Sequence, residues 1–249
     1  RPPRSTLFPY TTLFRSHAVC SSDLAQCALP IYSGVLFRLW RMNKRGHFFV
    51  FEGIDGSGKT TQIHLLQKRI EQQGVRCMET KEPTDGPIGS LLRQCLTGRM
   101  NIDEYSISAM FAADRLDHLQ NETDGLCHKI EEGISVISDR YVFSNYAYQS
   151  VSVPLEWLVQ LNAQAAKLLR PDCHIFIDVD PTTAMERMAA GRFHTERYET
   201  SDRLTKVRDR YLSLFEQFQD TERILIVDGN RPVDTIANDI WTQVSALYS

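Results

Sequence analysis

The chain has 249 residues, of which 42% are hydrophobic, and this content is ample for one good core. Its formal charge of −3 at pH 7 argues against a nucleic-acid-binding protein, whose surface usually carries a basic excess. No apolar run approaches the ~20 residues of a membrane span, and the six cysteines form no C-x-x-C pair, so we expect a cytoplasmic, soluble protein with reduced thiols and no membrane partner.

The first 41 residues differ from the rest of the chain. They contain a near-duplicate, Thr6–Tyr10 and Thr12–Ser16, and show no sustained helical or strand period. They resemble translated sequencing-adapter sequence more than a targeting peptide, because the apolar run Val35–Leu39 is short and interrupted by an arginine. We therefore expect a non-native or disordered extension over 1–41 and a single domain over 42–249.

Beyond the extension, strand-like and helix-like segments alternate. Strands are predicted at His47–Glu52, Val75–Thr80, Ile134–Ser138, His174–Val179 and Ile224–Val227. Helices are predicted over Thr60–Gln73, about 88–95, Asp103–Leu119, about 126–130, Leu155–Leu169, Thr182–Met188, Asp202–Phe218 and Val233–Leu247. This alternation predicts an α/β fold of three layers, with a five-stranded parallel sheet between helices.

A glycine-rich stretch, Gly53–Thr60, matches the phosphate-loop pattern G-x-x-x-x-G-K-[ST] between a predicted strand and a predicted helix. Its glycines let successive N–H groups converge on phosphate oxygens. Lys59 then reaches the β- and γ-phosphates, and the Thr60 hydroxyl is placed to ligate Mg²⁺. The predicted nucleotide-binding residues of this stretch are Gly53, Asp55, Gly56, Ser57, Gly58, Lys59, Thr60 and Thr61. The stretch predicts nucleotide binding without defining the reaction.

Further candidates follow the second and third strands, because ligands bind at the carboxyl ends of parallel strands. Asp139 is placed to orient Mg²⁺ through water, and Arg140 to clamp a second phosphate. An ordinary surface ion pair between the two is an equal alternative. Lys81 either meets an anionic substrate or is solvated.

Two other groups stand on predicted helices. Phe111 and Arg115 are four residues apart, so they share a face that offers a stacking ring and a donor to a planar base. Spacing alone favours a buried phenylalanine with an exposed arginine. The polar stretch Glu186–Glu199 carries Arg187, Arg192 and Arg197, which predict a basic lid that excludes water; pairing with the neighbouring glutamates is the alternative.

Together these features resemble the thymidylate kinase family, in its order and at its spacings, over nearly everything from Met42 onward. The matching segments are the phosphate loop in Phe51–Gln62, the Lys81-Glu82-Pro83 loop, Phe111–Arg115 with His118, Asp139–Tyr141 with Ser144 and Ala147–Gln149, and Glu196–Glu199. The resemblance implies a phosphate-loop NTPase fold with a helical lid and phosphoryl transfer from ATP to dTMP, giving dTDP for dTTP biosynthesis. It also implies Mg²⁺ as cofactor and a homodimer.

The resemblance also assigns roles by position. It implies that Asp55 holds the sugar 3′-hydroxyl, that Arg140 grips the dTMP phosphate and that Tyr148 crowds the 2′ position. It implies that Phe111 stacks on thymine while Arg115 donates to its O4. The remaining positions that match are Asn145 on the same base edge, Gln149 beside the substrate, and the lid arginines Arg192 and Arg197.

Two positions depart from the family pattern. Members of one subgroup place an arginine inside the phosphate loop, where this chain has Gly56, so Arg192 of the lid is expected to supply the transition-state cation. Lys81 stands where bacterial members usually have arginine, and lysine does not reproduce a bidentate fork. The expected catalytic set is Lys59, Asp139, Arg140 and Arg192.

Other functions remain open from the residues. A kinase for another nucleotide or for a deoxynucleoside needs the same phosphate loop. A switch or motor that hydrolyses nucleotide needs a partner surface, for which the acidic balance gives no support. An inactive binding module is the least favoured reading, since Lys59, Thr60, Asp139 and Arg140 are all intact.

Overall fold

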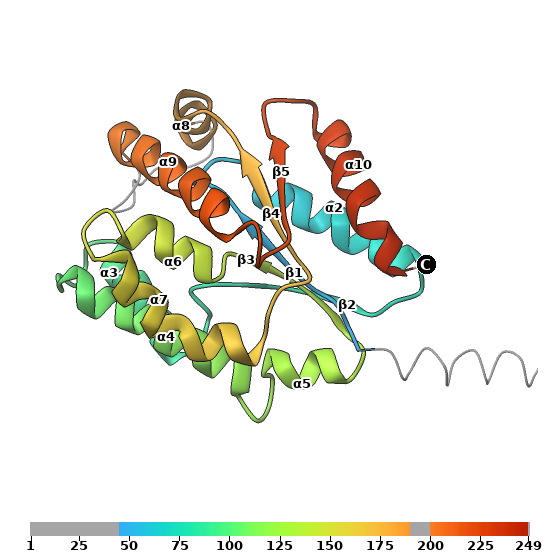
Figure 1. Ribbon diagram of the computed structural model, residues 1–249, viewed down its shortest axis with the longest axis horizontal. Helices are drawn as coiled ribbons and strands as arrows, with labels where there is room; N and C mark the ends of the chain where they lie inside the picture. The colour runs from blue at the N-terminus through green and yellow to red at the C-terminus, as the bar shows by residue number, and fades with distance from the viewer. Residues whose placement is uncertain (1–44, 190–199, 249) are drawn as a thin grey trace, which may run out of the picture. The chain divides into compact units, whose positions relative to one another are not determined.

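The structure is a computed structural model, and it describes residues 45–189 and 200–248. Five parallel strands form its sheet in the order β2-β3-β1-β4-β5 (Figure 1). Their bounds are Phe48–Glu52 (β1), Cys77–Lys81 (β2), Ser135–Asp139 (β3), Cys173–Asp178 (β4) and Ile224–Asp228 (β5). All five predicted strands are thereby confirmed, within three residues at each end.

The helices alternate with these strands along the chain. They are α2 (Lys59–Gln72), α3 (Pro87–Leu96), α4 (Glu104–Gln120), α5 (Leu126–Glu131), α6 (Val142–Gln149), α7 (Leu155–Leu168), α8 (Pro181–Ala189), α9 (Ser201–Phe218) and α10 (Val233–Val244), with a final 3₁₀ turn at Ser245–Tyr248. No helix among the described residues is both long enough and apolar enough to cross a membrane.

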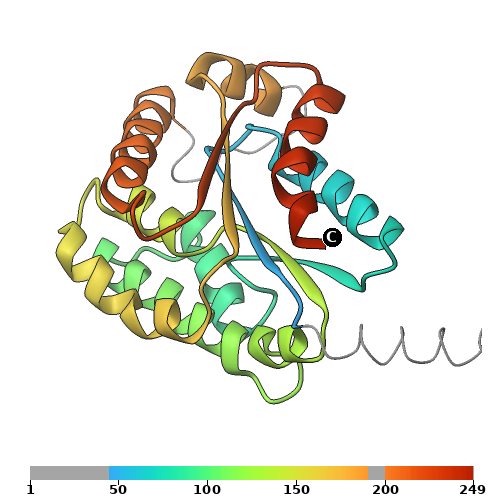
Figure 2. The same ribbon diagram turned by 45° about the vertical axis from the view of Figure 1, so that its right-hand side comes forward.

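The sheet is covered on both faces. Helices α2 and α10 pack against each other on one face, while α4, α6, α7 and α9 form a connected layer on the other (Figures 1 and 2). Strand β1 lies at the centre and all five of its residues are buried, as the apolar runs of a parallel sheet require. Burial of each phenylalanine there contributes about 1.5–3 kcal/mol. These layers confirm the predicted three-layer α/β fold.

Helix α6 is the one described helix that the sequence did not predict. All eight of its residues are buried, so it lacks the polar face on which the 3.6-residue period depends. At the ends of other helices, the local sequence signals agree with the structure. Asp103 caps α4 by accepting from the Ser106 N–H at 3.0 Å, and Gly74, with φ 71, follows the end of α2.

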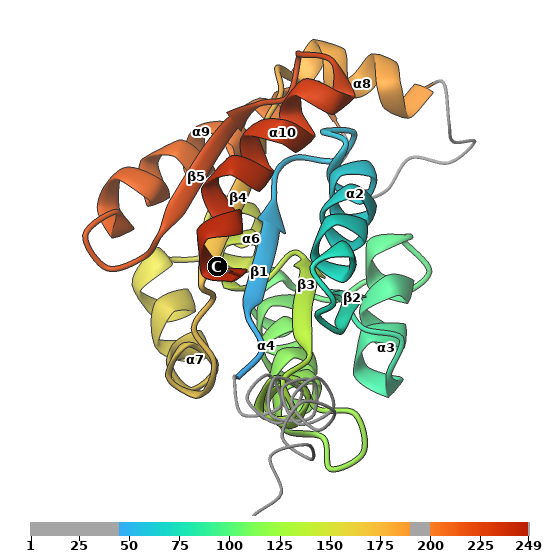
Figure 3. The same ribbon diagram turned by 90° about the vertical axis from the view of Figure 1, so that its right-hand side faces the viewer.

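The order of the strands determines where in the sheet a ligand site is expected. Because β1 has β3 on one side and β4 on the other, its carboxyl end lies where the winding of the sheet reverses, which is where open α/β sheets bind ligands. The loops after β1 and β3 therefore meet, and α8 lies at the same end of the sheet as the loop between β1 and α2 (Figure 3). Residues 190–199, which hold most of the predicted lid, lie outside the described residues, as does the predicted extension.

Candidate active site

The loop between β1 and α2 has the backbone of a phosphate cradle. Gly53, Gly56 and Gly58 adopt φ values of 148, 80 and 92, of which the last two lie in the left-handed region that glycine enters without strain. Gly58 begins α2, whose first N–H groups have no acceptor within the helix and carry its partial positive charge. This backbone geometry suits an anion, and phosphate binding at the loop stays a prediction.

Gly56 also lies against α8. A Cβ atom built on Gly56 would stand 2.4 Å from the backbone oxygen of Ala184 and 3.0 Å from Cγ of Met188. Real Cβ atoms essentially never come so close to backbone. An arginine at this position, as one subgroup has, would therefore require α8 to move.

Lys59 and Asp139 face each other across the loop. The Lys59 ammonium donates to the backbone oxygens of Gly53 and Ile54, both at 3.3 Å, and lies 3.9 Å from Oδ1 of Asp139. Burial and the charge of Arg140 lower the pKa of Lys59, against the opposing effect of Asp139 and Asp55. The ammonium is held where an incoming phosphate can take over its backbone contacts.

The same place fits a magnesium ion. Thr60 and Asp139 line one cavity of about 630 Å³ over the loop, called here the P-loop cavity. Oδ1 of Asp139 is buried and accepts no hydrogen bond from any described residue, so it is available to a cation or its water. No cluster of three or more acidic, histidine or cysteine ligands occurs in the described part of the chain.

Arg140 joins the two loops. Its Nη2 donates to Oδ1 of Asp55 at 2.5 Å and to the Tyr148 hydroxyl at 3.1 Å, while its Nη1 donates to the Gly53 carbonyl at 3.1 Å. Nη1 also donates to the hydroxyls of Ser144 and Tyr211, at 3.2 and 3.4 Å. The guanidinium is therefore a half-buried cation fixed by these contacts, and its ion-pair partner is Asp55 of the P-loop rather than the adjacent Asp139.

Asp55 is tied into the same group. Its Oδ2 accepts from the Tyr148 hydroxyl at 2.9 Å. Burial by itself would raise the pKa of Asp55, but the charges of Arg140 and Lys59 outweigh it and lower the pKa to about 2. The carboxylate is thus ionised at any physiological pH and holds Arg140 in place.

This lowered pKa predicts acid sensitivity. Because the folded pKa of Asp55 lies below its ordinary 3.8, the ionised form stabilises the fold above about pH 4, and this contribution of about 2 kcal/mol is lost as the pH falls from about 4 to about 2. We expect the difference in unfolding free energy between the parent and Asp55→Asn to shrink over that interval in urea titrations. A difference that stays constant from pH 5 to pH 2 would contradict this assignment.

A second cavity adjoins the first. It has a volume of about 100 Å³ and is called here the narrow cavity. Both cavities share Asp55, Glu82, Pro83, Leu96 and Arg140 in their linings. The narrow cavity is also lined by Phe111, Arg115, Asn145, Tyr148 and Gln149. All the predicted base-edge and sugar residues therefore come together at one place, next to the P-loop.

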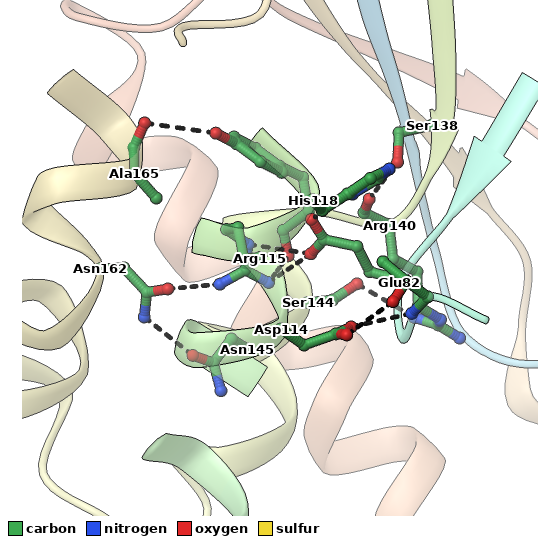
Figure 4. A network of polar contacts seen from close by, with 12 residues as sticks. Glu82, Asp114, Arg115, His118, Ser138, Arg140, Ser144, Asn145, Asn162 and Ala165 are labelled. Atoms are coloured by element: carbon green, nitrogen blue, oxygen red, sulfur yellow. Dashed lines mark hydrogen bonds and ion pairs between the residues drawn. The ribbon is translucent and has the colours of Figure 1, made fainter. Parts of the chain in front are cut away.

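Arg115 forms the polar wall of the narrow cavity. It is 1% exposed, so the exposed arginine that spacing alone favours was wrong. Its Nε donates to Oε2 of Glu82 at 2.8 Å, its Nη2 to the Tyr141 carbonyl at 3.1 Å, and its Nη1 to Oδ1 of Asn162 (Figure 4). Nη2 also forms an ion pair with Oε2 of Glu82 at 2.7 Å. Donation to thymine O4 stays a prediction.

Helix α4 also holds the loop that follows β2. Nδ1 of His118 lies 3.2 Å from Oε1 of Glu82 (Figure 4), and its Nε2 lies 2.7 Å from the Thr80 hydroxyl. Asp114 accepts from the N–H and hydroxyl of Thr84, at 2.8 and 2.6 Å. The loop that forms one wall of both cavities is therefore fastened to the helix that carries Phe111 and Arg115.

The other predicted residues are placed less tightly. Lys81 lines the P-loop cavity, but its side chain is 58% exposed and its ammonium lies 3.3 Å from Asp85. Ser57 is buried and Thr61 exposed, and neither lines the two cavities. Arg192 and Arg197 lie outside the described residues. Arg187 reaches the P-loop cavity while donating to the Gly229 carbonyl at 3.1 Å.

Known proteins match this chain over most of its length. A family model described as thymidylate kinase matches residues 51–240. A protein from Pyrococcus abyssi named probable thymidylate kinase is 39% identical over 202 residues, which cover 79% of this chain and 94% of that protein. Another of that name, from Thermococcus kodakarensis, is 37% identical over 209 residues, with 80% and 98% covered. The chain belongs to the thymidylate kinase family.

A third relative of that family name, from Methanocaldococcus jannaschii, is 35% identical over 194 residues, with 78% of this chain and 93% of the relative covered. The matched span, 51–240, contains every described site residue discussed above. Membership of the thymidylate kinase family confirms the resemblance drawn from the motifs.

Sequence reasoning missed two buried residues of this site. Glu52 is fully buried at the end of β1, where its Oε1 accepts from the N–H groups of Tyr141 and Ser144 at 3.1 and 3.3 Å. Its Oε2 accepts from the Ser144 and Tyr211 hydroxyls at 2.5 and 2.9 Å. Asn162, on α7, bridges Arg115 and Asn145. A carboxylate inside an otherwise apolar strand is the signal that could have revealed Glu52; no local pattern marks Asn162.

Proposed function

We propose that this protein transfers the terminal phosphoryl group of ATP to dTMP, giving ADP and dTDP. The observation that carries the proposal is the position of Arg140, a half-buried cation that lines both the P-loop cavity and the narrow cavity. Membership of the thymidylate kinase family supports the same reaction. A phosphate on each side of one guanidinium is the arrangement that an in-line transfer requires.

The proposal assigns a place to each substrate. The ATP phosphates accept hydrogen bonds from the N–H groups of the P-loop and from the Lys59 ammonium. The phosphate of dTMP binds Arg140, and the thymine base lies beside Phe111. An oxygen of the dTMP phosphate attacks the γ-phosphorus, and the bond from that phosphorus to the β,γ-bridging oxygen breaks and leaves ADP. Lys59 and Arg140 stabilise the charge that spreads over the transferred group.

We propose Mg²⁺ as the cofactor, held by the Thr60 hydroxyl and, through water, by Asp139. The ion would neutralise charge on the β- and γ-phosphates. The buried Oδ1 of Asp139 supports this assignment, because it accepts no hydrogen bond from the described residues and the Lys59 ammonium, with which it forms an ion pair, is as far as 3.9 Å away. Arg192 and Arg197 keep their proposed place as lid cations over the transferred group.

Base choice provides the test. A missing methyl group in an apolar pocket lowers kcat/KM by about 10- to 200-fold, so dUMP should be a poorer but measurable substrate. We expect dCMP and dGMP to be rejected more strongly, because they offer Arg115 the wrong hydrogen-bonding groups or a second ring. Coupled measurement of ADP release with each acceptor, and with none, tests this order. A preference for dCMP or dGMP refutes it, and rapid ADP release without an acceptor indicates a hydrolysing switch or motor instead.

We also propose that the protein is a homodimer and that residues 42–249 are sufficient for dimerisation and activity. The support for the dimer is the resemblance to the thymidylate kinase family, to which the chain belongs. Sedimentation analysis of the full chain, and of a shorter chain beginning at Met42, tests both points. A monomeric, active shorter chain would remove the dimer from the proposal, and an inactive one would remove the domain boundary.

A further inference from the structure

The direction of the Arg140 side chain depends on a strained turn directly after β3. The φ of Arg140 is 77, and a residue with a Cβ atom stays in that left-handed region only where other contacts hold it there. A return to negative φ would redirect the Cα–Cβ bond and carry the guanidinium away from Asp55 and the Gly53 carbonyl. The contacts that hold this turn therefore also aim the cation.

Hydrogen bonds hold the turn on both sides of Arg140. Its N–H donates to the Phe51 carbonyl at 2.9 Å, and its own carbonyl accepts from the Ser138 hydroxyl at 2.8 Å (Figure 4). The next N–H along the chain, that of Tyr141, donates to Oε1 of Glu52 at 3.1 Å. The contact from Ser138 comes from β3 itself, two residues before the carbonyl that it fixes, so one side chain closes the turn locally.

Ser138 itself lies away from both cavities. It is fully buried between its strand neighbours Val50 of β1 and Thr80 of β2, and it lines neither the P-loop cavity nor the narrow cavity. Its hydroxyl therefore does not touch a substrate in either cavity, and any effect that it has on the reaction must pass through a neighbouring residue.

We propose that Ser138 is a positioning residue for phosphoryl transfer, whose hydroxyl holds the Arg140 carbonyl so that the guanidinium stays aimed at the dTMP phosphate. This inference rests on the proposed function, since it takes Arg140 to be the residue that grips this phosphate. Without the hydroxyl, a carbonyl beside a strained residue loses its donor inside the protein, and the turn relaxes in part of the molecules.

Ser138→Ala removes the donor and leaves every other side chain of the site in place. We expect kcat/KM for dTMP to fall by about 5- to 10-fold, as the loss of one buried hydrogen bond predicts. The KM for ATP and the Mg²⁺ concentration that gives half the maximal rate should stay within about two-fold of the parent, because the P-loop is unchanged. Ser138→Thr keeps the hydroxyl on a side chain that suits a strand, so it should recover most of the activity.

Ser135→Ala is the matched control. Ser135 is also fully buried on β3 but lies at the opposite end of the strand, where its hydroxyl oxygen accepts from the His47 N–H and the Tyr248 hydroxyl, both at 3.2 Å. Both alanine variants should unfold at lower urea concentrations than the parent, whereas only Ser138→Ala should lose activity towards dTMP. An equal loss of activity in Ser135→Ala would overturn the proposal, because general loosening of β3 would then explain both results.

The deciding experiment combines the substitution with Arg140→Ala in a double-mutant cycle. If Ser138 acts through the guanidinium, Ser138→Ala lowers kcat/KM for dTMP in the parent but changes it by less than about two-fold once residue 140 is alanine. A similar fall in both backgrounds overturns the proposal, because Ser138 then acts through another residue, such as Asp139. Unchanged kcat/KM in the parent background overturns it as well.

Two checks keep the result clear. Should Ser138→Ala fold poorly by circular dichroism, Ser138→Cys, whose thiol is a weak donor of similar size, takes its place in the cycle with the same expected outcomes. A parent protein that releases ADP no faster with dTMP than without it contradicts the proposed function itself. The parent assay therefore distinguishes failure of the function from failure of the role of Ser138.

Discussion

Replacing Arg140 with alanine is expected to lower kcat/KM for dTMP by about 10²- to 10³-fold. The substitution removes the one described cation that both cavities share and leaves Asp55 without its nearest positive partner. Arg140→Lys should recover little, because an ammonium cannot hold Asp55, Tyr148 and the Gly53 carbonyl in one plane while also meeting a phosphate. Initial rates over a range of dTMP concentrations give both kcat and KM.

A matched control is Arg231→Ala, whose side chain lies 2.7 Å from Asp239 at the surface and should leave both constants unchanged. If Arg140→Ala retains more than about a tenth of the parent kcat/KM, Arg140 is not the phosphate clamp.

The backbone of Arg140 offers a second comparison. Its φ is 77, the left-handed region in which a non-glycine residue is strained, and its N–H donates to the Phe51 carbonyl at 2.9 Å. Arg140→Gly should therefore be more stable than Arg140→Ala by about 1 kcal/mol and yet equally inactive. Urea unfolding of the two variants measures this difference. The strain is tolerated because the fixed backbone aims the guanidinium at the junction of the cavities.

Local patterns explain which features the sequence could predict. Three kinds of pattern each extend over fewer than about twenty residues: the apolar runs of the five strands, the period of the amphipathic helices and the glycine-rich loop. They can therefore be recognised in a single sequence. Helix α6 was missed because it is buried on every side. Its burial follows from what packs around it, α7 and α9 among them, which no local pattern contains.

The same reasoning applies to the site. Lys59, Asp139 and Arg140 stand next to strand ends, and their places follow from strand order. Arg115 can be buried because it donates to Glu82 and Asn162, and these partners lie 33 and 47 residues away in the chain. A polar residue at helical spacing normally indicates an exposed face, so the burial of Arg115 was not predictable from spacing and became visible only when the partners were in place.

Glu52→Ala is expected to reduce the free energy of unfolding by about 3–5 kcal/mol, the largest stability effect at this site. Four donors from Tyr141, Ser144 and Tyr211 converge on its two oxygens, and all would lose their acceptor inside the protein. Burial makes each loss expensive, because no water replaces the carboxylate. Glu71→Ala, on the exposed face of α2, is the control and should change stability by at most about 0.5 kcal/mol.

Glu52→Gln separates stability from positioning. A glutamine keeps one oxygen for the N–H groups of Tyr141 and Ser144, but its NH₂ group would face the Ser144 and Tyr211 hydroxyls, to which Arg140 already donates. Each hydroxyl can accept from both donors, but its own O–H then no longer has the carboxylate oxygen to which it donates in the parent. We therefore expect a milder loss of about 1–3 kcal/mol in urea, accompanied by a fall in kcat, because Arg140 loses two of its supports.

The outcomes distinguish two roles for Glu52. If Glu52→Gln loses stability with unchanged kcat, the carboxylate serves only to join β1 to α6 and α9. A fall in kcat measured well below the unfolding transition instead means that Glu52 positions Arg140 through Ser144 and Tyr211. The geometry favours the second result, because the two hydroxyls that bind Glu52 are the same two that bind Nη1 of Arg140.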